Sequence, residues 1–453
     1  MLKLLILISF ITFVQAKTLH NLTLNQALKI VEKQNIELNI AKFDEDIAKL
    51  GIKVAKGYDY GKLDATIMGL RSNDAGNVFG FKLQRREATF NDFGFDEFLY
   101  HWQIGSPANV LLNVKPKNLN YPDPQNHYDV KFTYVLPLYT GGKLSAYKKI
   151  AKEMLNMAKI DRAKAIGTKK SQVKSAFYDI TILEHFEKDL KVVEKNILRL
   201  KASVKSLKKE GYAKKSDMLE VESKLSDVKR MLFQAKTFKE LSYDFLSFLL
   251  NQDVKSIKEI ENIDSLDNKI TLADVLKKNA DIKKADTGLK IQSEMVNVQK
   301  SAFLPEVGTF AEYGSADDEF LHHFREHDRY TIGVQAKLNI LNGGVDNAKY
   351  QQEKIKKLKV KEQTMLARKG MTLKYKKLKT ELENQKMQIK ALQKELDLAK
   401  EIYRAYRQRY KEGLVSINDV LIKQSAWIEK LLKLLDAKNK KNKKILEIEE
   451  LTF

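Results

Sequence analysis

The fold is decided by a short segment that occurs twice, as Leu138-Tyr139-Thr140-Gly141-Gly142 and, 202 residues later, as Ile340-Leu341-Asn342-Gly343-Gly344. Before each copy, apolar and polar residues alternate with the period of a β-strand. After each copy, about 66 residues without a proline lead to Gly211 or to Gly413. The glycine pairs therefore predict turns from a strand into a helix roughly 100 Å long.

Two further pairs of segments repeat in the same order. Leu22-Thr23-Leu24 resembles Ile270-Thr271-Leu272 at an offset of 248, and Lys209-Glu210-Gly211 resembles Lys411-Glu412-Gly413 at an offset of 202. One duplicated unit explains all three pairs, and the change of offset gives the first copy about 46 extra residues before its glycine pair.

The duplication predicts the division of the chain. The first repeat spans 17–250 and contains a helix, a strand pair with an enlarged outer loop at 71–127, a long helix, a tip near 211 and a helix. An inter-repeat segment follows at 251–269, and the second repeat spans 270–453 with its tip near 413. Thr23 and Thr271 are expected to cap opening helices of about 30 residues each.

Residues 128–136 and 330–338 alternate apolar and polar side chains over about the length that crosses a bilayer as a tilted strand. Weaker partners are expected near 63–70 and 307–314. An ordinary antiparallel sheet packed on one face has the same pattern. Four strands cannot close a barrel in lipid, so strands in a membrane would require several chains to share one barrel.

The lower ends of the long helices carry apolar residues at alternating spacings of four and three, typical of a coiled-coil seam. The residues are Phe186, Leu190, Val193, Ile197, Leu200, Val204 and Leu207, and in the second repeat Ile389, Leu392, Leu396, Ala399, Tyr403, Tyr406 and Tyr410. Residues 345–411 also hold 20 Lys and Arg against 8 Asp and Glu. This charge indicates a solvated outer helix face or, if it faces a lumen, a preference for anionic cargo.

The N-terminal sequence sets the expected compartment. Residues 1–16 have a basic start at Lys3, an apolar run and small residues before a cleavage position, the pattern of a signal peptide. The chain has no cysteine, which excludes disulfides, thiolate metal sites and a lipid-modified cysteine. Its net charge of +22 suggests nucleic acid, but export makes a nucleic-acid partner unexpected.

Taken together, these segments resemble the TolC-type outer-membrane efflux proteins, the outer membrane factors of tripartite efflux and type I secretion systems. The resemblance covers nearly the whole mature chain. It rests on the paired Leu-Thr-Leu and Ile-Thr-Leu openings, on Leu304-Pro305, on the Gly-Gly turns, and on Tyr410-Lys411-Glu412-Gly413 followed by Ser416-Ile417-Asn418-Asp419-Val420-Leu421.

The resemblance implies a mainly α protein with a small β part. Each chain of a homotrimer gives four membrane-spanning strands to one 12-stranded barrel, and its helices form a coiled-coil tunnel into the periplasm. Such proteins are passive ducts in the outer membrane of Gram-negative cells, without cofactors. Their partners are a periplasmic adaptor and an inner-membrane transporter, and outer-membrane lipid surrounds the barrel. The cargo and the particular pump cannot be read from the sequence.

The resemblance also assigns roles at the periplasmic tips. Adaptor docking is expected at Gly211, Tyr212 and Ala213 and at Gly413, Leu414 and Val415. Asp419, Asp217 and Tyr410 are expected at the channel entrance, the aspartates as a carboxylate ring. Helix N-terminal capping is the equal alternative for both aspartates. Val415 and Ile422 replace a basic and an acidic residue that the family often has, so its closing network is only partly present.

No nucleotide-binding, zinc-protease or nucleophile-elbow motif occurs, so no enzyme activity is expected. His323 and His327 are four residues apart and would share one face if their segment were helical, which makes them a weak metal candidate. Aromatic residues at 79–95 in the outer loop are expected to pack the loop or to cover the exit.

Two other protein classes have some of these features. A periplasmic adaptor has long antiparallel helices, but it requires a β-domain split around a single hairpin. A secreted coiled-coil structural or binding protein would not need duplicated Gly-Gly units below alternating strands.

Overall fold

The computed structural model describes residues 18–260 and 269–453. The expected signal peptide at 1–16 and residues 261–268 of the inter-repeat segment lie outside the described residues. The chain forms two compact units. We call residues 49–154 and 290–359 the sheet unit, and residues 18–48, 155–289 and 360–453, as far as they are described, the helical unit. Each unit takes segments from both sequence repeats.

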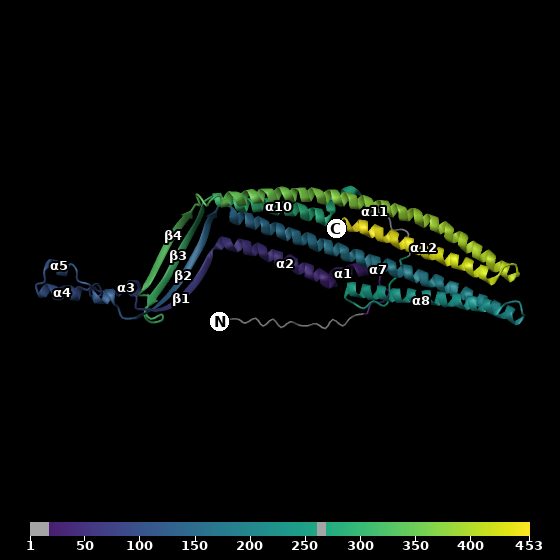
Figure 1. The fold of residues 1–453 in the computed structure, drawn as a ribbon, viewed down its shortest axis with the longest axis horizontal. Coiled ribbons are helices and arrows are strands. Elements are labelled where there is room, and N and C mark those ends of the chain that lie inside the picture. The colour runs from purple at the N-terminus through teal and green to yellow at the C-terminus, as the bar shows by residue number, and fades with distance from the viewer. Residues whose placement is uncertain (1–17, 261–268) are drawn as a thin grey trace. The chain divides into compact units, whose positions relative to one another are not determined.

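The sheet unit contains one antiparallel sheet in the order β1-β2-β3-β4 (Figure 1). Its strands are β1 (Lys62–Ser72), β2 (Gln125–Thr140), β3 (Glu306–Asp317) and β4 (Asp328–Lys337). All four expected strands are therefore confirmed.

The connection between β1 and β2 was expected to be a loop at 71–127, but it contains short helices. They are α3 (Ala75–Gln84), α4 (Phe95–Gln103), α5 (Ala108–Leu111) and α6 (Lys117–Asn120). Asp74 starts α3 by accepting the Asn77 N–H at 3.0 Å. The short length of these helices hid their period within the aromatic sequence.

The two faces of the sheet differ in polarity. Register pairs Ile67 with Val130 and Ala311 with Ile332, which places these apolar residues on one face. Much of this face is open, since Ile67 and Ile332 are 65% and 72% exposed, whereas Val130 is buried. The opposite face carries ion pairs, including Arg329 to Asp129 at 2.5 Å and Lys131 to Glu312 at 3.8 Å.

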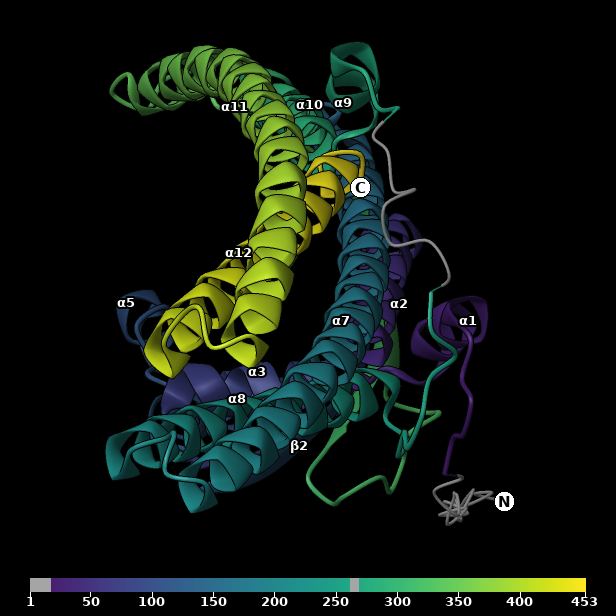
Figure 2. The ribbon, with the colours of Figure 1, turned by 90° about the vertical axis from the view of Figure 1, so that its right-hand side faces the viewer.

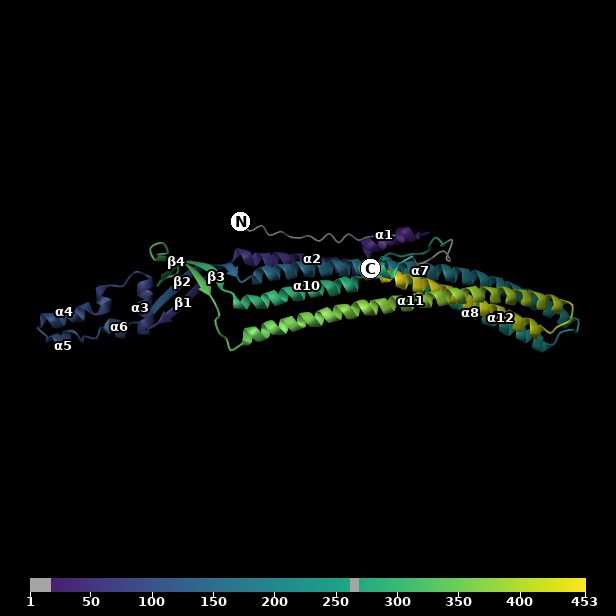
Figure 3. The same cartoon turned by 90° about the horizontal axis from the view of Figure 1, so that it is seen from above.

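The helical unit is built around two antiparallel hairpins. The long helices α7 (Lys143–Lys209) and α11 (Val345–Lys411) have 67 residues each, as expected, and fold back into α8 (Lys215–Leu250) and α12 (Ile417–Glu450). Figure 1 shows α8 beside α7 and α12 beside α11, and Figures 2 and 3 show the same helices from two other sides. Within 18–260 and 269–453, no helix is both long enough and apolar enough to cross a membrane.

The predicted heptad residues form the core of the hairpins. Leu190, Val193 and Ile197 are fully buried and pack in one cluster with Val221, Val228 and Leu421, among others, from α8 and α12. Tyr403 belongs to the same cluster, and Tyr406 and Tyr410 pack at its edge. The coiled-coil seam predicted from the 3.5-residue period is confirmed.

The prediction of single opening helices was wrong in both repeats. Each is broken, into α1 (Leu24–Gln34) and α2 (Ile36–Gly57), and into α9 (Leu272–Lys278) and α10 (Ala280–Lys300). The buried residues at the breaks are Asn35 and Asn279. Their side chains accept the N–H of Leu38 and Ile282, which caps the second helix of each pair. An asparagine inside a helical pattern does not by itself predict such a break.

Candidate functional site

The two tips have the same backbone design. Gly211 and Gly413 have φ of +81° and +75°, a conformation that glycine adopts without steric cost. The Tyr212 N–H donates to the Leu207 carbonyl at 2.8 Å, and the Leu414 N–H donates to the Arg409 carbonyl at 2.9 Å. These bonds across five residues satisfy helix-end carbonyls as in a Schellman motif. Each long helix thus stops at a fixed residue and reverses.

The six residues expected to dock an adaptor divide into two kinds. Gly211, Tyr212, Gly413 and Leu414 are exposed, with 81% exposure for Tyr212 and 68% for Leu414. Ala213 and Val415 instead pack against the hairpin core. Each tip therefore presents one large apolar side chain to solvent on a backbone anchored from below.

Asp217 and Asp419 both cap helices. Asp217 accepts the Lys214 N–H at 2.8 Å at the start of α8. Asp419 accepts both the N–H and the hydroxyl of Ser416, at 3.0 and 2.6 Å, and Ser416 accepts the Asp419 N–H in return. The Ser416 hydroxyl, followed by its N–H, lowers the pKa of Asp419. The capping alternative thus describes both aspartates within one protomer.

Tyr410 lies in the last turn of α11 and is half-buried against the hairpin core. Burial raises the pKa of its hydroxyl, and the negative charge of Asp217 adds to that effect. The structure therefore places Tyr410 within electrostatic reach of Asp217, which comes from the other repeat. The groups that lower the pKa of Asp419 are instead Ser416 and Lys423.

An aromatic group near the tips was not singled out from the sequence. Tyr403 stacks on Trp427 of α12, with 5.5 Å between ring centroids. The Lys423 Nζ and the Arg409 guanidinium lie 5.1 and 5.8 Å from the centre of the Tyr406 ring. The spacing of three and four between the tyrosines was read only as a seam, and no pattern in α11 points to Trp427.

The glycine pairs lie where strands meet long helices. Gly141 and Gly142 follow β2 and have φ of +60° and +86°, and Gly343 and Gly344 precede α11 with φ of +65° and +82°.

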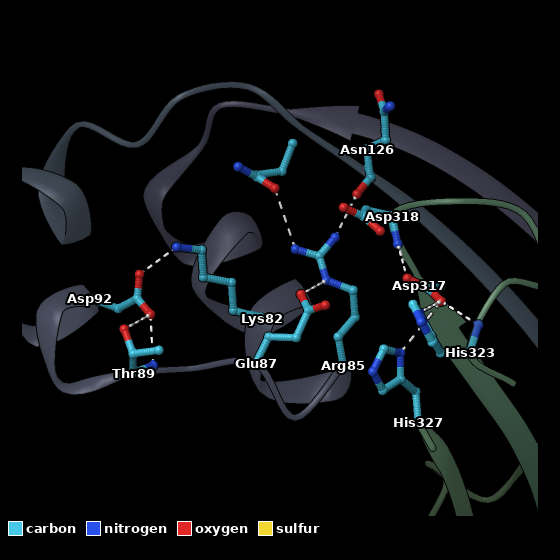
Figure 4. A network of polar contacts seen from close by, with 11 residues as sticks. Lys82, Arg85, Glu87, Thr89, Asp92, Asn126, Asp317, Asp318, His323 and His327 are labelled. Carbon is cyan, nitrogen blue, oxygen red and sulfur yellow. Dashed lines mark hydrogen bonds and ion pairs between the residues drawn. The ribbon is translucent and has the colours of Figure 1, made fainter. Parts of the chain in front are cut away.

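His323 and His327 do not lie on a helix, so the premise of the expected pair was wrong. Residues 318–327 connect β3 to β4 through turns. The turns place both imidazoles beside Asp317 (Figure 4). Asp317 lies at the end of a strand, and nothing in the spacing of the histidines pointed to it.

The comparison with protein families and the comparison with solved structures point to the same kind of protein. Residues 271–452 match the family described as Outer membrane efflux protein. Comparison with curated proteins found no match. Among solved structures, the chain resembles the CmeC outer membrane channel of Campylobacter jejuni, at 15% identity and a TM-score of 0.74, over 95% of this chain and 85% of that one.

Two further structures have the same fold. The outer membrane protein VceC of Vibrio cholerae has 13% identity and a TM-score of 0.73, over 95% of this chain and 96% of that one. The open state of the MtrE outer membrane channel of Neisseria gonorrhoeae has 14% identity and a TM-score of 0.72, over 95% and 88%. The resemblance seen in the sequence is thereby supported: residues 271–452 match the outer membrane efflux protein family, and the chain has the fold of these outer-membrane channels over nearly its whole length.

Proposed function

We propose that the protein is the outer-membrane duct of a tripartite efflux pump or of a type I secretion system, and that it carries substrate passively to the exterior. The observation that carries this proposal is the two-faced sheet. An open apolar face and a charged opposite face suit strands with lipid on one side and water on the other. A sheet in water would have to cover that apolar face.

The duct requires more than one chain. Among the described residues, β1 and β4 each have a partner strand on one side only, so their outer edges have no strand to pair with in one protomer. Unpaired backbone groups are costly in hydrocarbon. Three copies would join these edges into a 12-stranded barrel, with β1 of one copy beside β4 of the next.

The tips are the proposed contact for the periplasmic adaptor. Tyr212 and Leu414 are large, exposed and apolar, and side chains of this kind anchor helix-in-groove contacts. Tyr410, Asp217 and Asp419 lie next to them and would line the entrance. In this arrangement the same aspartate would cap its helix and line the entrance.

The first experiment tests location and assembly together. The full chain is expressed in a Gram-negative host, the outer membrane is isolated, and the protein-only mass is measured by light scattering in detergent. We expect outer-membrane fractionation and three times the mass of one mature chain. A soluble periplasmic monomer would overturn the proposal.

The second experiment tests the tips in native cells. A photo-crosslinking amino acid is placed at Tyr212 or at Leu414, and Leu398, which is 62% exposed within α11, serves as the matched control. We expect the two tip positions to capture a periplasmic protein with a long helical hairpin and the control position not to. Equal capture at all three positions would contradict the proposal that the tips dock the adaptor.

A further inference from the structure

The turn from β3 to β4 gathers three imidazoles around one carboxylate. Asp317 ends β3, and His322, His323 and His327 follow within the turn at 318–327. Four of the seven histidines of the chain lie elsewhere. Figure 4 shows His323 and His327 directed toward the carboxylate of Asp317.

The distances fit a shared ligand. The Nδ1 atoms of His323 and His327 lie 3.3 and 3.5 Å from the same oxygen, Oδ2 of Asp317. Asp317, His322 and His323 each offer a ligand atom, and these atoms lie within 4.8 Å of one another. A metal ion bound at about 2.0–2.3 Å brings its ligands to such separations.

The burial of Asp317 and His327 indicates that a positively charged ligand belongs beside them. The Asp317 side chain is only 4% exposed, and its carboxylate is held by the N–H groups of Asp318 at 2.8 Å and of His323 at 2.7 Å. His327 is 8% exposed, and its buried Nδ1 has no hydrogen-bond partner among the described residues. Buried polar groups are normally satisfied, so an unpartnered imidazole nitrogen facing a buried carboxylate points to a ligand between them.

The turn is fixed independently of its histidines. Phe320 packs on Tyr128 and Phe324 packs on Tyr313, with ring centroids 6.2 and 6.0 Å apart. Arg86, from the connection between β1 and β2, donates to the carbonyls of Glu326 and Asp328. These contacts hold both ends of the turn, while His322 and His323 remain 56% and 42% exposed and accessible to an ion from solvent.

We propose that Asp317, His322, His323 and His327 form a site for a divalent transition-metal ion, with Zn²⁺ as its typical occupant. Imidazole nitrogens with one carboxylate suit Zn²⁺, Co²⁺, Ni²⁺ or Cu²⁺, whereas Ca²⁺ and Mg²⁺ require oxygen ligands. Glu87 and Asp318 offer such an oxygen set with Asp317, but both are exposed. The bound ion would clamp the turn to the end of β3. The inference does not depend on the channel function.

The test uses the tag-free full chain in detergent, stripped with a chelator and titrated with ZnCl₂ in a calorimeter. We expect one Zn²⁺ per chain, with binding weakened about tenfold or more in a His322→Gln/His323→Gln double variant. His20→Gln is the matched control, because His20 is an exposed histidine outside the cluster, and its binding is expected to match the original chain. Co²⁺ is expected to give a visible absorption band that the double variant lacks.

Any one of three results would overturn the site. One is Zn²⁺ affinity that is unchanged in the double variant, and another is Ca²⁺ binding tighter than Zn²⁺ binding. Asp317→Asn is measured as well, since it removes the charge but keeps an acceptor for the turn. His322 is exposed and His323 is partly exposed, so the double variant is expected to fold. Absence of Zn²⁺ binding to the original chain also rejects the proposal.

Discussion

The two repeats agree closely at their helix ends and differ in what connects their strands. In the first repeat residues 73–124 lie between β1 and β2 and contain four α-helices, whereas residues 318–327 make the same connection in the second repeat with turns alone. By contrast, Asn35 and Asn279 bond alike to the ends of the returning helices: their Nδ2 groups donate to the carbonyls of Leu249 and Leu451 at 2.8 and 2.9 Å. Packing between helices fixes one part of the repeat and leaves the strand connection free to change.

The largest loss of stability is expected from replacing Asn35 or Asn279. We expect Asn35→Ala and Asn279→Ala each to lower the free energy of unfolding by about 2–3 kcal/mol, since each removes a helix cap and leaves a buried carbonyl without its donor. Denaturant midpoints followed by circular dichroism check this. A large loss of unfolding free energy in one variant and none in the other would show that the two asparagines contribute differently to stability despite their matching geometry.

The ion pairs of the two hairpins differ in burial. In the first hairpin Glu187 is buried and bonds to Lys191 at 2.7 Å and to Lys239 at 2.6 Å, which lowers its pKa to about 2. Its stabilisation is present above the ordinary value of 4.5 and is lost as the pH falls from there toward 2. In the second hairpin the pair of Glu395 and Lys430, also at 2.6 Å, is largely exposed.

We therefore expect Glu187→Gln to cost about 2 kcal/mol at pH 7 and nearly nothing at pH 2. Glu395→Gln is the control, with an expected change below about 0.5 kcal/mol at pH 7, as for exposed pairs. Unfolding midpoints of the three proteins across this pH range test it. Equal losses for both variants at neutral pH would contradict the assignment.

Replacing either tip glycine is expected to lower the stability of the protein by the same amount. Gly211→Ala and Gly413→Ala each place a side chain on a backbone of positive φ, at a cost of about 1–2 kcal/mol. Gly370→Ala is the matched control within α11, because its position is open and helical, and it should stabilise by about 0.5–1 kcal/mol. Melting temperatures measured in one detergent give all three values, and a stabilising Gly413→Ala would rule out the left-handed turn.

The smallest expected effect comes from a difference between the helix caps at the two tips. Ser416 accepts the Asp419 N–H through its hydroxyl, whereas Lys214 at the equivalent end of α8 has no acceptor in its side chain. We expect Ser416→Ala to cost about 1 kcal/mol and Lys214→Ala to cost nearly nothing. Hydrogen exchange at the first turns of α12 and α8 is the measurement. Faster exchange in both variants would mean that side-chain identity at position 214 matters after all.

Sequence patterns predicted the elements whose period is long or duplicated. The heptads ending at Tyr410 and the alternation at 128–136 and 330–338 each extend over enough residues to identify a helix or a strand. The breaks at Asn35 and Asn279 were missed because one buried hydrogen bond to a distant carbonyl leaves no local signal. The approach of Asp317 to the histidines was missed for a related reason: a turn, unlike a helix, has no fixed spacing from which neighbours can be predicted.

The open edges of the sheet come from different repeats, β1 from the first and β4 from the second. Two copies inserted in the same orientation cannot pair like edges without turning the apolar face of one of them to water. Each new copy must therefore join head to tail, through a heterologous contact. In the proposed assembly, growth has a direction and ends only when the ring closes, so the curvature of the sheet, rather than the strength of any single contact, sets the number of chains.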